Sequence, residues 1–336
     1  MIDKKDKQPV GVKITSWGHF IPQTSLTNSE LSKRFNVTTD WILERTGIEE
    51  RKYFSDGATS DMIVKAALSC LQQTNLSATD IDCIIVATMT PDHYCPSTAT
   101  FVHQKLGTNN AWGFDLMAAC SGYLYALQLA TSLINSNSYK TVLVCGADKM
   151  SSCIDPSDRK TVLVLADGAG VSLLQQSSND NDIVDTICKL DSSHSSDITM
   201  IASGSKVPST IENISQGKHY LRFERKTIFD TAISLMLSVA EEVLSKNRLK
   251  FEDIDFIVPH QANKRIIETL AKKFDLPIEK FIINVEQIGN TSAATIPIAI
   301  SQALEDKKLK GNEKLLLVSV GAGYTYSASL INLNHV

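Results

Sequence analysis

Apolar runs of strand length alternate along the chain with stretches in which apolar residues recur at helical spacing. Continuous apolar runs are typical of strands buried on both faces of a sheet, and helical spacing predicts helices with one buried face. The predicted strands are residues 11–17, 81–88, 114–117, 141–146, 256–259 and a pair at 161–165 and 169–174. The predicted helices are residues 60–73 with Ser60 as N-cap, 99–106, 120–135, 229–245 and 263–274. The alternation favours an α/β fold with mixed, mostly parallel sheets covered by helices.

The two parts of the chain repeat the same order of elements. Asp80-Ile-Asp and Asp253-Ile-Asp each follow an amphipathic helix and open a strand. The strands that begin at Val142 and Leu316 are separated by nearly the same length of chain as the two Asp-Ile-Asp units. A common offset over several elements predicts two duplicated α/β halves, residues 1–176 and 177–336, divided within the polar stretch 175–182.

The composition narrows the class of protein. The chain has 336 residues, 43% of them hydrophobic and 21% charged, with a net charge of -4, which argues against a general nucleic-acid binder. We find neither a run of about 18 apolar residues nor a secretory signal, so no membrane association is expected. The seven cysteines form no C-x-x-C pair or Cys/His metal spacing, which favours a reduced, cytoplasmic protein without a bound metal.

Cys120 is the candidate nucleophile. It lies between small residues at or just before the first turn of a predicted helix, where unpaired N–H groups and the helix dipole favour a thiolate. The alternative is an inert core cysteine, which is the expected state of Cys70, Cys83 and Cys145 in their apolar surroundings. The choice depends on which partners the fold brings to Cys120.

Two further polar residues are expected at the same edge of the molecule. His260 directly follows the predicted strand 256–259, and Asn290 precedes a helix that corresponds, in the duplicated half, to the helix after Cys120. Ligands in such folds bind beyond the carboxyl ends of the strands. Taken singly, His260 could be a buried structural histidine and Asn290 only a helix cap.

A cysteine with a histidine and an asparagine suggests two classes of enzyme. A papain-like protease fits poorly, because C-G-[SA]-C-[WY] is absent and the nucleophile lies in mid-chain. The other class transfers an acyl group through a cysteine thioester and forms a carbon–carbon bond, with two hydrogen-bond donors that stabilise an enolate.

The chain resembles the β-ketoacyl-acyl-carrier-protein synthase III family from about Gly11 to Leu333. The shared motifs are Asp40-Trp-Ile-Leu-Glu-Arg-Thr-Gly-Ile, Ala118-Ala-Cys-Ser-Gly-Tyr, Asp155-Pro-Ser-Asp-Arg, Asp167-Gly-Ala-Gly, Pro259-His-Gln-Ala-Asn, Gly289-Asn-Thr-Ser-Ala-Ala and Gly321-Ala-Gly-Tyr-Thr-Tyr. The resemblance implies a thiolase-like fold in a layered αβαβα arrangement and a homodimer.

The resemblance also implies a mechanism. Cys120 accepts the acyl group of an acyl-CoA primer, and a malonyl-acyl carrier protein then loses CO₂ to give an enolate held by His260 and Asn290. The enolate attacks the Cys120 thioester, and the product is a 3-oxoacyl-carrier protein that initiates fatty acid synthesis. The backbone N–H groups of Cys120 and Gly323 would form the oxyanion hole. CoA thioesters are substrates in this scheme, and no cofactor is implied.

The resemblance also implies residues that bind CoA, and the helix pattern indicates residues that bind the carrier protein. By resemblance, Trp41 stacks on the adenine of CoA, Arg45 and Arg159 flank the nucleotide, and Asn263 faces the pantetheine channel. Independently of the resemblance, helix 263–274 has one apolar face and one basic face. The basic face is a candidate surface for an acidic carrier protein and consists of Lys264, Arg265, Lys272 and Lys273.

Several positions depart from the family pattern. Cys95 stands where the family often has a phenylalanine that gates the acyl pocket of the partner subunit, so a longer or branched primer is plausible. Other departures are Arg225, Asp230, Ala322, Tyr326 and Ser327. They leave open a specialised relative of secondary metabolism that transfers acyl groups or joins β-keto intermediates. A non-catalytic acyl-binding protein is a third hypothesis, which the Cys, His and Asn set argues against.

Overall fold

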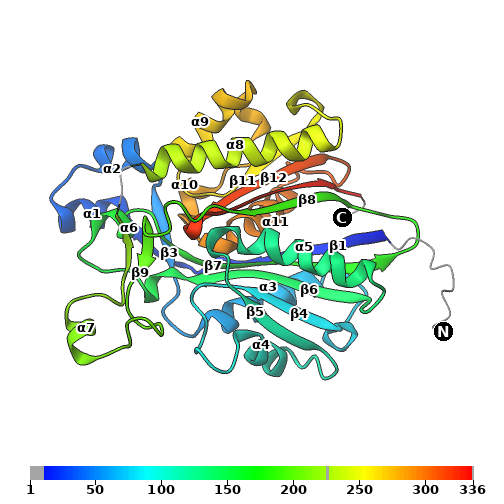
Figure 1. Cartoon of the computed structure of the whole chain (residues 1–336), viewed down its shortest axis with the longest axis horizontal. Coiled ribbons are helices and arrows are strands. Elements are labelled where there is room, and N and C mark those ends of the chain that lie inside the picture. The colour runs from blue at the N-terminus through cyan, green and yellow to red at the C-terminus, as the bar shows by residue number, and fades with distance from the viewer. Residues whose placement is uncertain (1–10, 225–226, 335–336) are drawn as a thin grey trace.

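The computed structural model describes residues 11–224 and 227–334, and it has five layers (Figure 1). The first sheet has the order β1 (Gly11–Phe20), β7 (Asp167–Ser177), β6 (Thr141–Lys149), β4 (Cys83–Ala87), β5 (Trp112–Leu116). The second has the order β8 (Ile183–Leu190), β13 (Thr325–Asn332), β12 (Lys314–Gly321), β11 (Phe256–Pro259). Helices α5 (Gly122–Asn135) and α11 (Thr295–Glu305) lie between the two sheets. The predicted αβαβα layers are therefore confirmed.

Helices also cover the outer face of each sheet. The first sheet is covered by α3 (Thr59–Leu71) and α4 (Thr98–Leu106), and the second by α8 (Ile228–Lys246) and α9 (Lys264–Phe274). The remaining elements are α1 (Asn28–Phe35), α2 (Thr39–Thr46), α6 (Arg159–Val162), α7 (Ile211–Ser215), α10 (Val285–Ile288), and the short strand pairs β2 (Thr24–Thr27) with β3 (Glu50–Tyr53) and β9 (Ile198–Met200) with β10 (Leu221–Phe223). No helix in the described part of the chain is long and apolar enough to cross a membrane.

The sheets are mixed, as expected, but they are not mostly parallel. Among the described strands of the two large sheets, β4 pairs in parallel with β5 and β6, and β11 with β12, whereas the other four pairings are antiparallel. β13 returns along β12 directly after η7 (Ala322–Tyr324), and so short a connection cannot give a parallel neighbour. β7 returns along β6 after the longer connection 150–166, which contains α6.

The two sheets share one strand order. β1-β7-β6-β4 and β8-β13-β12-β11 have the same sequence of antiparallel, antiparallel and parallel pairings. Two short 3₁₀ turns, η2 (Ala119–Ser121) and η6 (Ser292–Ala294), occupy equivalent places, because each directly precedes one of the two helices between the sheets, α5 or α11. These matches support the predicted duplication, and the boundary between residues 176 and 177 stays a prediction.

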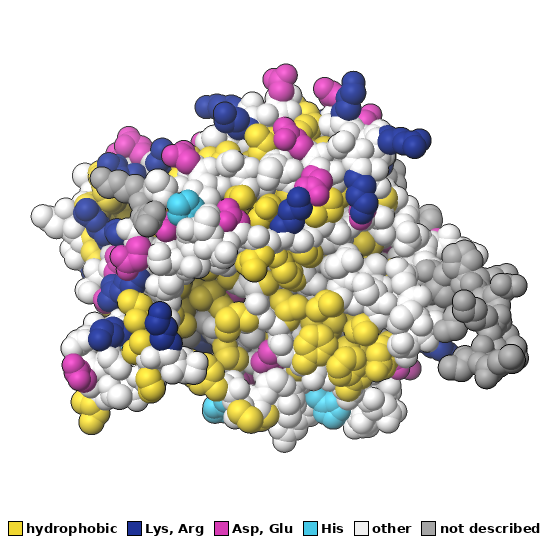
Figure 2. All heavy atoms as spheres, in the orientation of Figure 1, with side chains coloured by type: hydrophobic (Ala, Val, Ile, Leu, Met, Phe, Trp, Pro, Cys, Tyr) yellow, Lys and Arg dark blue, Asp and Glu magenta, His cyan; other side chains and the backbone are white. Residues whose placement is uncertain are grey.

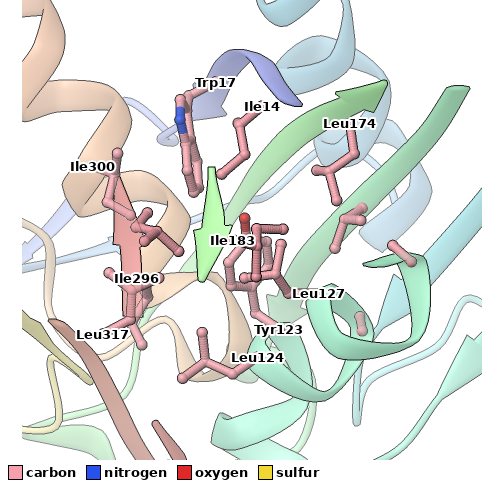
Figure 3. Packing of buried hydrophobic residues seen from close by; sticks show 14 of the residues in the cluster. Ile14, Trp17, Tyr123, Leu124, Leu127, Leu174, Ile183, Ile296, Ile300 and Leu317 are labelled. Atoms are coloured by element: carbon pink, nitrogen blue, oxygen red, sulfur yellow. The ribbon is translucent and has the colours of Figure 1, made fainter. Parts of the chain in front are cut away.

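The main core lies between the sheets. α5 contributes Tyr123, Leu124 and Leu127, which pack with Ile296 of α11 and Leu317 of β12 (Figure 3). Gly146 of β6 permits η6 to approach, since a Cβ there would lie 2.4 Å from the carbonyl oxygen of Ala293. The core thus holds the two 3₁₀ turns against each other at one edge of both sheets.

Two local predictions are wrong. Residues 161–165 are not a strand, because Asp158 caps the short helix α6, which runs through Val162. Helix α3 begins at Thr59 with Ala58 as N-cap, and the hydroxyl of Ser60 donates a hydrogen bond to Asp92 over 2.5 Å instead of capping. The other predicted strands and helices are present within a few residues of their expected bounds.

Candidate active site

The nucleophile turn connects β5 to α5. Cys120 is the middle residue of η2, directly before α5, which is where the sequence pattern placed it. Its side chain is half-buried, and its Sγ lies 3.4 Å from the Oγ of Ser292. The preceding residue, Ala119, has a φ of 47°, so the chain turns sharply here and presents the thiol.

Asn290 is held at the start of the matching turn η6. Its backbone N–H donates to the carbonyl of Val164 over 2.9 Å, and its carbonyl accepts from Ala166 over 2.8 Å. Its side-chain Oδ1 accepts the N–H of Ser292 over 2.8 Å. The side-chain oxygen therefore fixes the backbone at the start of η6, and the amide NH₂ remains as a donor group of a residue that lines the cavity.

His260 directly follows β11 and is buried. Its Nδ1 lies 2.7 Å from the Oγ1 of Thr295, and Thr295 Oγ1 lies 3.0 Å from the carbonyl oxygen of Ser292. Burial lowers the pKa of His260 to about 3, so the imidazole is neutral at ordinary pH. The carbonyl of Ser292 and Nδ1 of His260 compete for the single hydroxyl proton of Thr295. In the tautomer in which Nδ1 accepts that proton, Nε2 carries a proton and can act as a donor.

Ser292 joins the three predicted residues. Its hydroxyl contacts Cys120, its N–H binds Asn290, and its carbonyl contacts Thr295, which in turn contacts His260. Sequence reasoning did not single out Ser292 or Thr295. Both lie within or directly after the Gly289-Asn-Thr-Ser-Ala-Ala motif, so their proximity to Asn290 was a usable signal.

Cys120 and Asn290 line a cavity of about 530 Å³. Its wall is mainly apolar and includes Met89, Met150, Leu165, Ile198 and Phe229. Asn263 and the exposed Lys160 also line it. Lys160 was not predicted as a site residue, although it directly follows Arg159 in the Asp155-Pro-Ser-Asp-Arg motif; its Nζ donates to the carbonyl of Phe223 over 3.0 Å. A mainly apolar cavity with a few polar groups suits an acyl or pantetheine chain.

The environment of Cys120 favours a neutral thiol, whereas the helix start alone favoured a thiolate. Burial raises the pKa of Cys120 to about 12, and the hydrogen bond from Ser292 lowers it only in part, while the charge of Asp148 raises it further. The helix-start argument considered only local groups, whereas burial and Asp148 come from the rest of the fold.

Gly321 rather than Gly323 adjoins the backbone N–H of Cys120. A Cβ at Gly321 would lie 2.8 Å from the nitrogen of Cys120, and Gly321 and Ala322 line the cavity, whereas Gly323 does not. This geometry does not support the prediction that Gly323 is the second oxyanion donor, because its neighbours in η7 (Ala322–Tyr324) line the cavity and Gly323 does not. It favours Ala322 in that position.

The three predicted nucleotide-binding residues come together at the surface. The guanidinium carbon of Arg45 lies 4.0 Å from the ring centroid of Trp41, and that of Arg159 lies 5.4 Å from it. Arg45 and Trp41 share helix α2, whereas Arg159 opens α6. Asn263 caps α9, because its Oδ1 accepts the N–H of Ile266 over 3.0 Å.

The four basic residues of α9 do not form one patch. Lys264 forms an ion pair with Glu286 over 2.5 Å, and Arg265 lies over the ring of Phe229 at 5.5 Å. Lys272 and Lys273 are exposed in the last turn, about 12 Å further along the helix at 1.5 Å per residue. Only the first pair adjoins the cavity, next to the lining residue Asn263.

The positions that depart from the family pattern lie in different surroundings. Cys95 is exposed in the loop between β4 and α4, and Asp230 is exposed in the first turn of α8. Ala322 lines the cavity, whereas Ser327 is buried and bonds to Ser319 over 2.9 Å. Tyr326 is half-buried in β13. Arg225 lies outside the described residues.

The burial of His260 predicts a pH-dependent stability. The unfolded chain protonates this ring below about pH 6.5, whereas the folded protein does not until about pH 3. Between these values the unfolded state binds one more proton, so stability falls as the pH falls, by about 1.4 kcal/mol per pH unit for this group. Urea unfolding of the wild type and His260→Asn from pH 7 to 4 checks this. Parallel pH dependences for the two proteins would contradict it.

Comparisons with known proteins show the family of this chain. Residues 114–192 match the family model of 3-oxoacyl-[acyl-carrier-protein] synthase III, and residues 244–333 match the model of its C-terminal part. The chain is 43% identical over 322 residues to a β-ketoacyl-[acyl-carrier-protein] synthase III of Koribacter versatilis, covering 95% of this chain and 97% of that one. A relative of the same name from Chlorobium phaeobacteroides is also 43% identical, over 95% and 98% of the two chains.

Solved structures show the same relation. The 3-oxoacyl-[acyl-carrier-protein] synthase III of Aquifex aeolicus superposes with a TM-score of 0.89 at 37% identity, over 96% of this chain and all of that one. The priming β-ketosynthase of the R1128 polyketide pathway superposes with a TM-score of 0.89 at 28% identity, over 98% of both chains. The chain therefore belongs to the β-ketoacyl-[acyl-carrier-protein] synthase III family of condensing acyltransferases.

Proposed function

We propose that this protein condenses an acyl-CoA primer with malonyl-acyl carrier protein, releasing CoA and CO₂, and so initiates fatty acid synthesis. The family supplies the reaction class, and its named members act on acyl-carrier-protein substrates. The observation that carries the proposal is that Cys120 and Asn290, which line an apolar cavity, both contact Ser292, and that His260 is connected to Ser292 through Thr295.

In the first half-reaction Cys120 attacks the acyl-CoA carbonyl. The sulfur–carbon bond forms, the tetrahedral oxyanion accepts hydrogen bonds from the backbone N–H of Cys120 and of Ala322, and CoA departs as a thiolate. The apolar cavity wall excludes water from the resulting thioester, which would otherwise be hydrolysed.

In the second half-reaction the malonyl group loses CO₂. The electron pair left behind forms an enolate, whose oxygen accepts hydrogen bonds from Nε2–H of His260 and the NH₂ of Asn290. Because burial lowers the pKa of His260 to about 3, the ring remains a neutral donor and is a weak base. The enolate carbon attacks the Cys120 thioester, and the 3-oxoacyl chain leaves on the carrier protein.

A direct assay tests this proposal. The protein is incubated with malonyl-acyl carrier protein and a series of acyl-CoAs, and the carrier is analysed by mass spectrometry. We expect a 3-oxoacyl-carrier protein that appears together with CO₂ and free CoA. Release of CoA without any 3-oxoacyl product would instead support the alternative, a specialised relative that transfers acyl groups to another acceptor or joins β-keto intermediates.

Trp41, Arg45 and Arg159 are proposed to bind the nucleotide part of CoA. The arginines already stack near the indole, so an adenine must displace one of them or extend the stack. Trp41→Ala should raise the KM for acyl-CoA about tenfold while kcat changes little, because stacking contributes about 1–2 kcal/mol far from the reacting atoms. Steady-state kinetics check this, with exposed Leu43→Ala on the same helix as the control. An unchanged KM would remove Trp41 from the CoA site.

The carrier protein is proposed to approach the end of α9 that carries Arg265. That residue adjoins the cavity and is exposed, whereas the ammonium of Lys264 is paired with Glu286. Lys272 and Lys273 lie too far along α9 to contact the same part of a carrier as Arg265. The carrier site therefore consists of fewer residues than the four predicted.

A second copy of the chain is the proposed partner at β5. This strand ends the first sheet, and hydrophobic side chains gather over α5 and β5 (Figure 2). Trp112 and Met117 at its two ends are 42% and 72% exposed. Unpaired sheet edges and apolar patches favour association. The dimer would place the loop that carries the exposed Cys95 near the partner subunit. The proposed protein is thus a cytoplasmic homodimer that uses no cofactor.

The dimer has a specific test. Trp112→Asp adds a charge at the proposed contact, so the protein should sediment as a monomer at concentrations where the wild type is a dimer. The control Leu68→Asp alters another exposed apolar residue, on α3. A wild type that sediments as a monomer at all concentrations, with full condensing activity, would refute the proposal.

A further inference from the structure

Arg51 is a buried cation near Asn290 that has no part in the scheme above. It belongs to β3, and its side chain is fully buried. Burial lowers the pKa of Arg51 to about 10, so the guanidinium is charged at neutral pH. Among the described residues no carboxylate forms an ion pair with it, and its Nη2 has no hydrogen-bond partner there. A buried charge without a carboxylate partner costs stability, which favours a role in the site over a role in packing alone.

The guanidinium of Arg51 binds backbone carbonyls and a side-chain amide. Its Nε donates to the carbonyl of Leu163 over 2.6 Å. Its Nη1 donates to Oδ1 of Asn28 and, over 3.5 Å, to the carbonyl of Glu49. Asn28 is itself fixed, because its Nδ2 donates to the carbonyl of Ile48 over 2.8 Å. The guanidinium is therefore held in one orientation, with its Nε directed at Leu163.

Residues 163–166 hold the backbone of Asn290. The N–H of Asn290 donates to the carbonyl of Val164 over 2.9 Å, and its carbonyl accepts the N–H of Ala166 over 2.8 Å. The two bonds form a short parallel bridge outside the sheets. The first residue of this segment is the one whose carbonyl Arg51 binds.

Arg51 also contacts the other side of this bridge. A Cβ at Gly289 would lie 3.2 Å from Cγ of Arg51, so the arginine stem packs against the residue before Asn290. Gly289 has a φ of 87°, which a glycine adopts without strain. The N–H of Glu49, directly before β3, donates to the carbonyl of Glu286 in α10 over 2.8 Å and connects β3 to the same segment. Arg51 therefore lies against both segments that meet at Asn290.

Building on the proposed function, we propose that Arg51 is a positioning residue for the enolate step. It holds residues 163–166 against Gly289 and so fixes the place at which the amide of Asn290 donates to the enolate oxygen. Arg51 does not line the cavity, so it acts through Asn290 and not on the reacting atoms.

The nucleophile turn is supported from another direction. The hydroxyl of Thr325 donates to the carbonyl of Ala118 over 2.7 Å, and the hydroxyl of Ser121 donates to the carbonyl of Thr325 over 3.0 Å. Both bonds connect this turn to the start of β13 in the second sheet. Loss of Arg51 should therefore impair the step that uses Asn290 and leave the acylation of Cys120 nearly unchanged.

Arg51→Met tests this role, because it keeps an apolar stem and removes the guanidinium. We expect single-turnover condensation to slow about 10- to 100-fold, as for a small displacement of a catalytic group, while acylation by acyl-CoA changes less than about twofold. Arg51→Lys, which retains a cation within reach of a carbonyl, should condense at least about threefold faster than Arg51→Met. The matched control is Asp182→Asn, at another buried charged residue, which binds the N–H of Ile14 and the amide of Asn334 away from the cavity. It should slow neither step per folded molecule.

Hydrogen–deuterium exchange gives a readout that does not depend on activity. The backbone amides of Asn290 and Ala166 should exchange at least about tenfold faster in Arg51→Met than in the wild type. The amide of Ser121, which donates to Ala118 in the nucleophile turn, should be unchanged. If Arg51→Met does not fold, the half-buried Asn28 replaces it as the target, because Asn28→Ala removes the partner of Nη1. The same two effects are then expected at about threefold.

The outcomes separate this role from the proposed function. Acylation that falls as far as condensation, unchanged condensation, or unchanged exchange at Asn290 would each overturn the positioning role of Arg51. A wild type that forms no 3-oxoacyl product would refute the proposed function. The exchange rates would then still decide whether Arg51 holds Asn290 in place.

Discussion

His260→Ala and Asn290→Ala should each reduce condensation about 100- to 1,000-fold while acylation of Cys120 continues at nearly the wild-type rate. Each variant removes one of two donors to the enolate oxygen, and loss of one such donor typically has this effect. Neither side chain is required in the first half-reaction, in which Cys120 is the nucleophile and the oxyanion donors are backbone groups. The acyl-enzyme should therefore accumulate.

Rapid-quench mass spectrometry measures the two steps separately. Acyl-enzyme formation is followed with acyl-CoA alone, and the decay of that acyl-enzyme is followed after addition of malonyl-acyl carrier protein. The matched control is Asn247→Ala, which removes an amide with two hydrogen bonds at the end of α8. If the acylation rate of His260→Ala falls as far as its condensation rate, then His260 is the base for Cys120 and not only a donor to the enolate.

Gly321→Ala should impair both half-reactions, by about 100-fold or more each. Its Cβ would lie 2.8 Å from the nitrogen of Cys120 and 3.0 Å from the carbonyl oxygen of Ala118, and these backbone atoms cannot move without disturbing the nucleophile turn. The methyl group would therefore cover an oxyanion donor used in both tetrahedral intermediates. This pattern differs from that of His260→Ala, which affects one step.

Overpacking alone must be separated from this effect. Gly18→Ala provides the control, since its Cβ would lie 2.3 Å from the carbonyl oxygen of Ala66, in contact with α3 and away from the cavity. Both variants should lose roughly 1–3 kcal/mol of stability. Only Gly321→Ala should lose rate per folded molecule in single-turnover acylation. Equal rates for the two variants would exclude a role for the N–H of Cys120.

Local sequence patterns were sufficient for most of the secondary structure and for the three central side chains. Cys120, His260 and Asn290 each lie where a predicted strand ends or a predicted helix begins. The hydrophobic periodicity and the correspondence between the two halves therefore predicted that the three residues lie at one edge of the molecule. Residues 161–165 were misread because a β-branched, apolar run has strand propensity, whereas the Asp158 cap and tertiary packing impose the helix α6.

The interactions that the sequence did not reveal are the long-range ones. Asp148 and Ala293 belong to different halves of the chain, and nothing local indicates that the N–H of Ala293 donates to Asp148. The expectation of a thiolate at Cys120 likewise considered only the helix start, whereas burial and the charge of Asp148 raise the pKa of its thiol. The contacts of Lys264 with Glu286 and of Arg265 with the ring of Phe229 were not predictable from α9 alone, because both partners come from other elements.

The central claim is a thioester on Cys120, and intact-mass spectrometry after incubation with acyl-CoA tests it most directly. The wild type should gain the mass of one acyl group, peptide mapping should place it on Cys120 among the seven cysteines, and Cys120→Ala should gain none. An unmodified wild type across the series of acyl-CoAs, or an adduct that persists in Cys120→Ala, would contradict the claim.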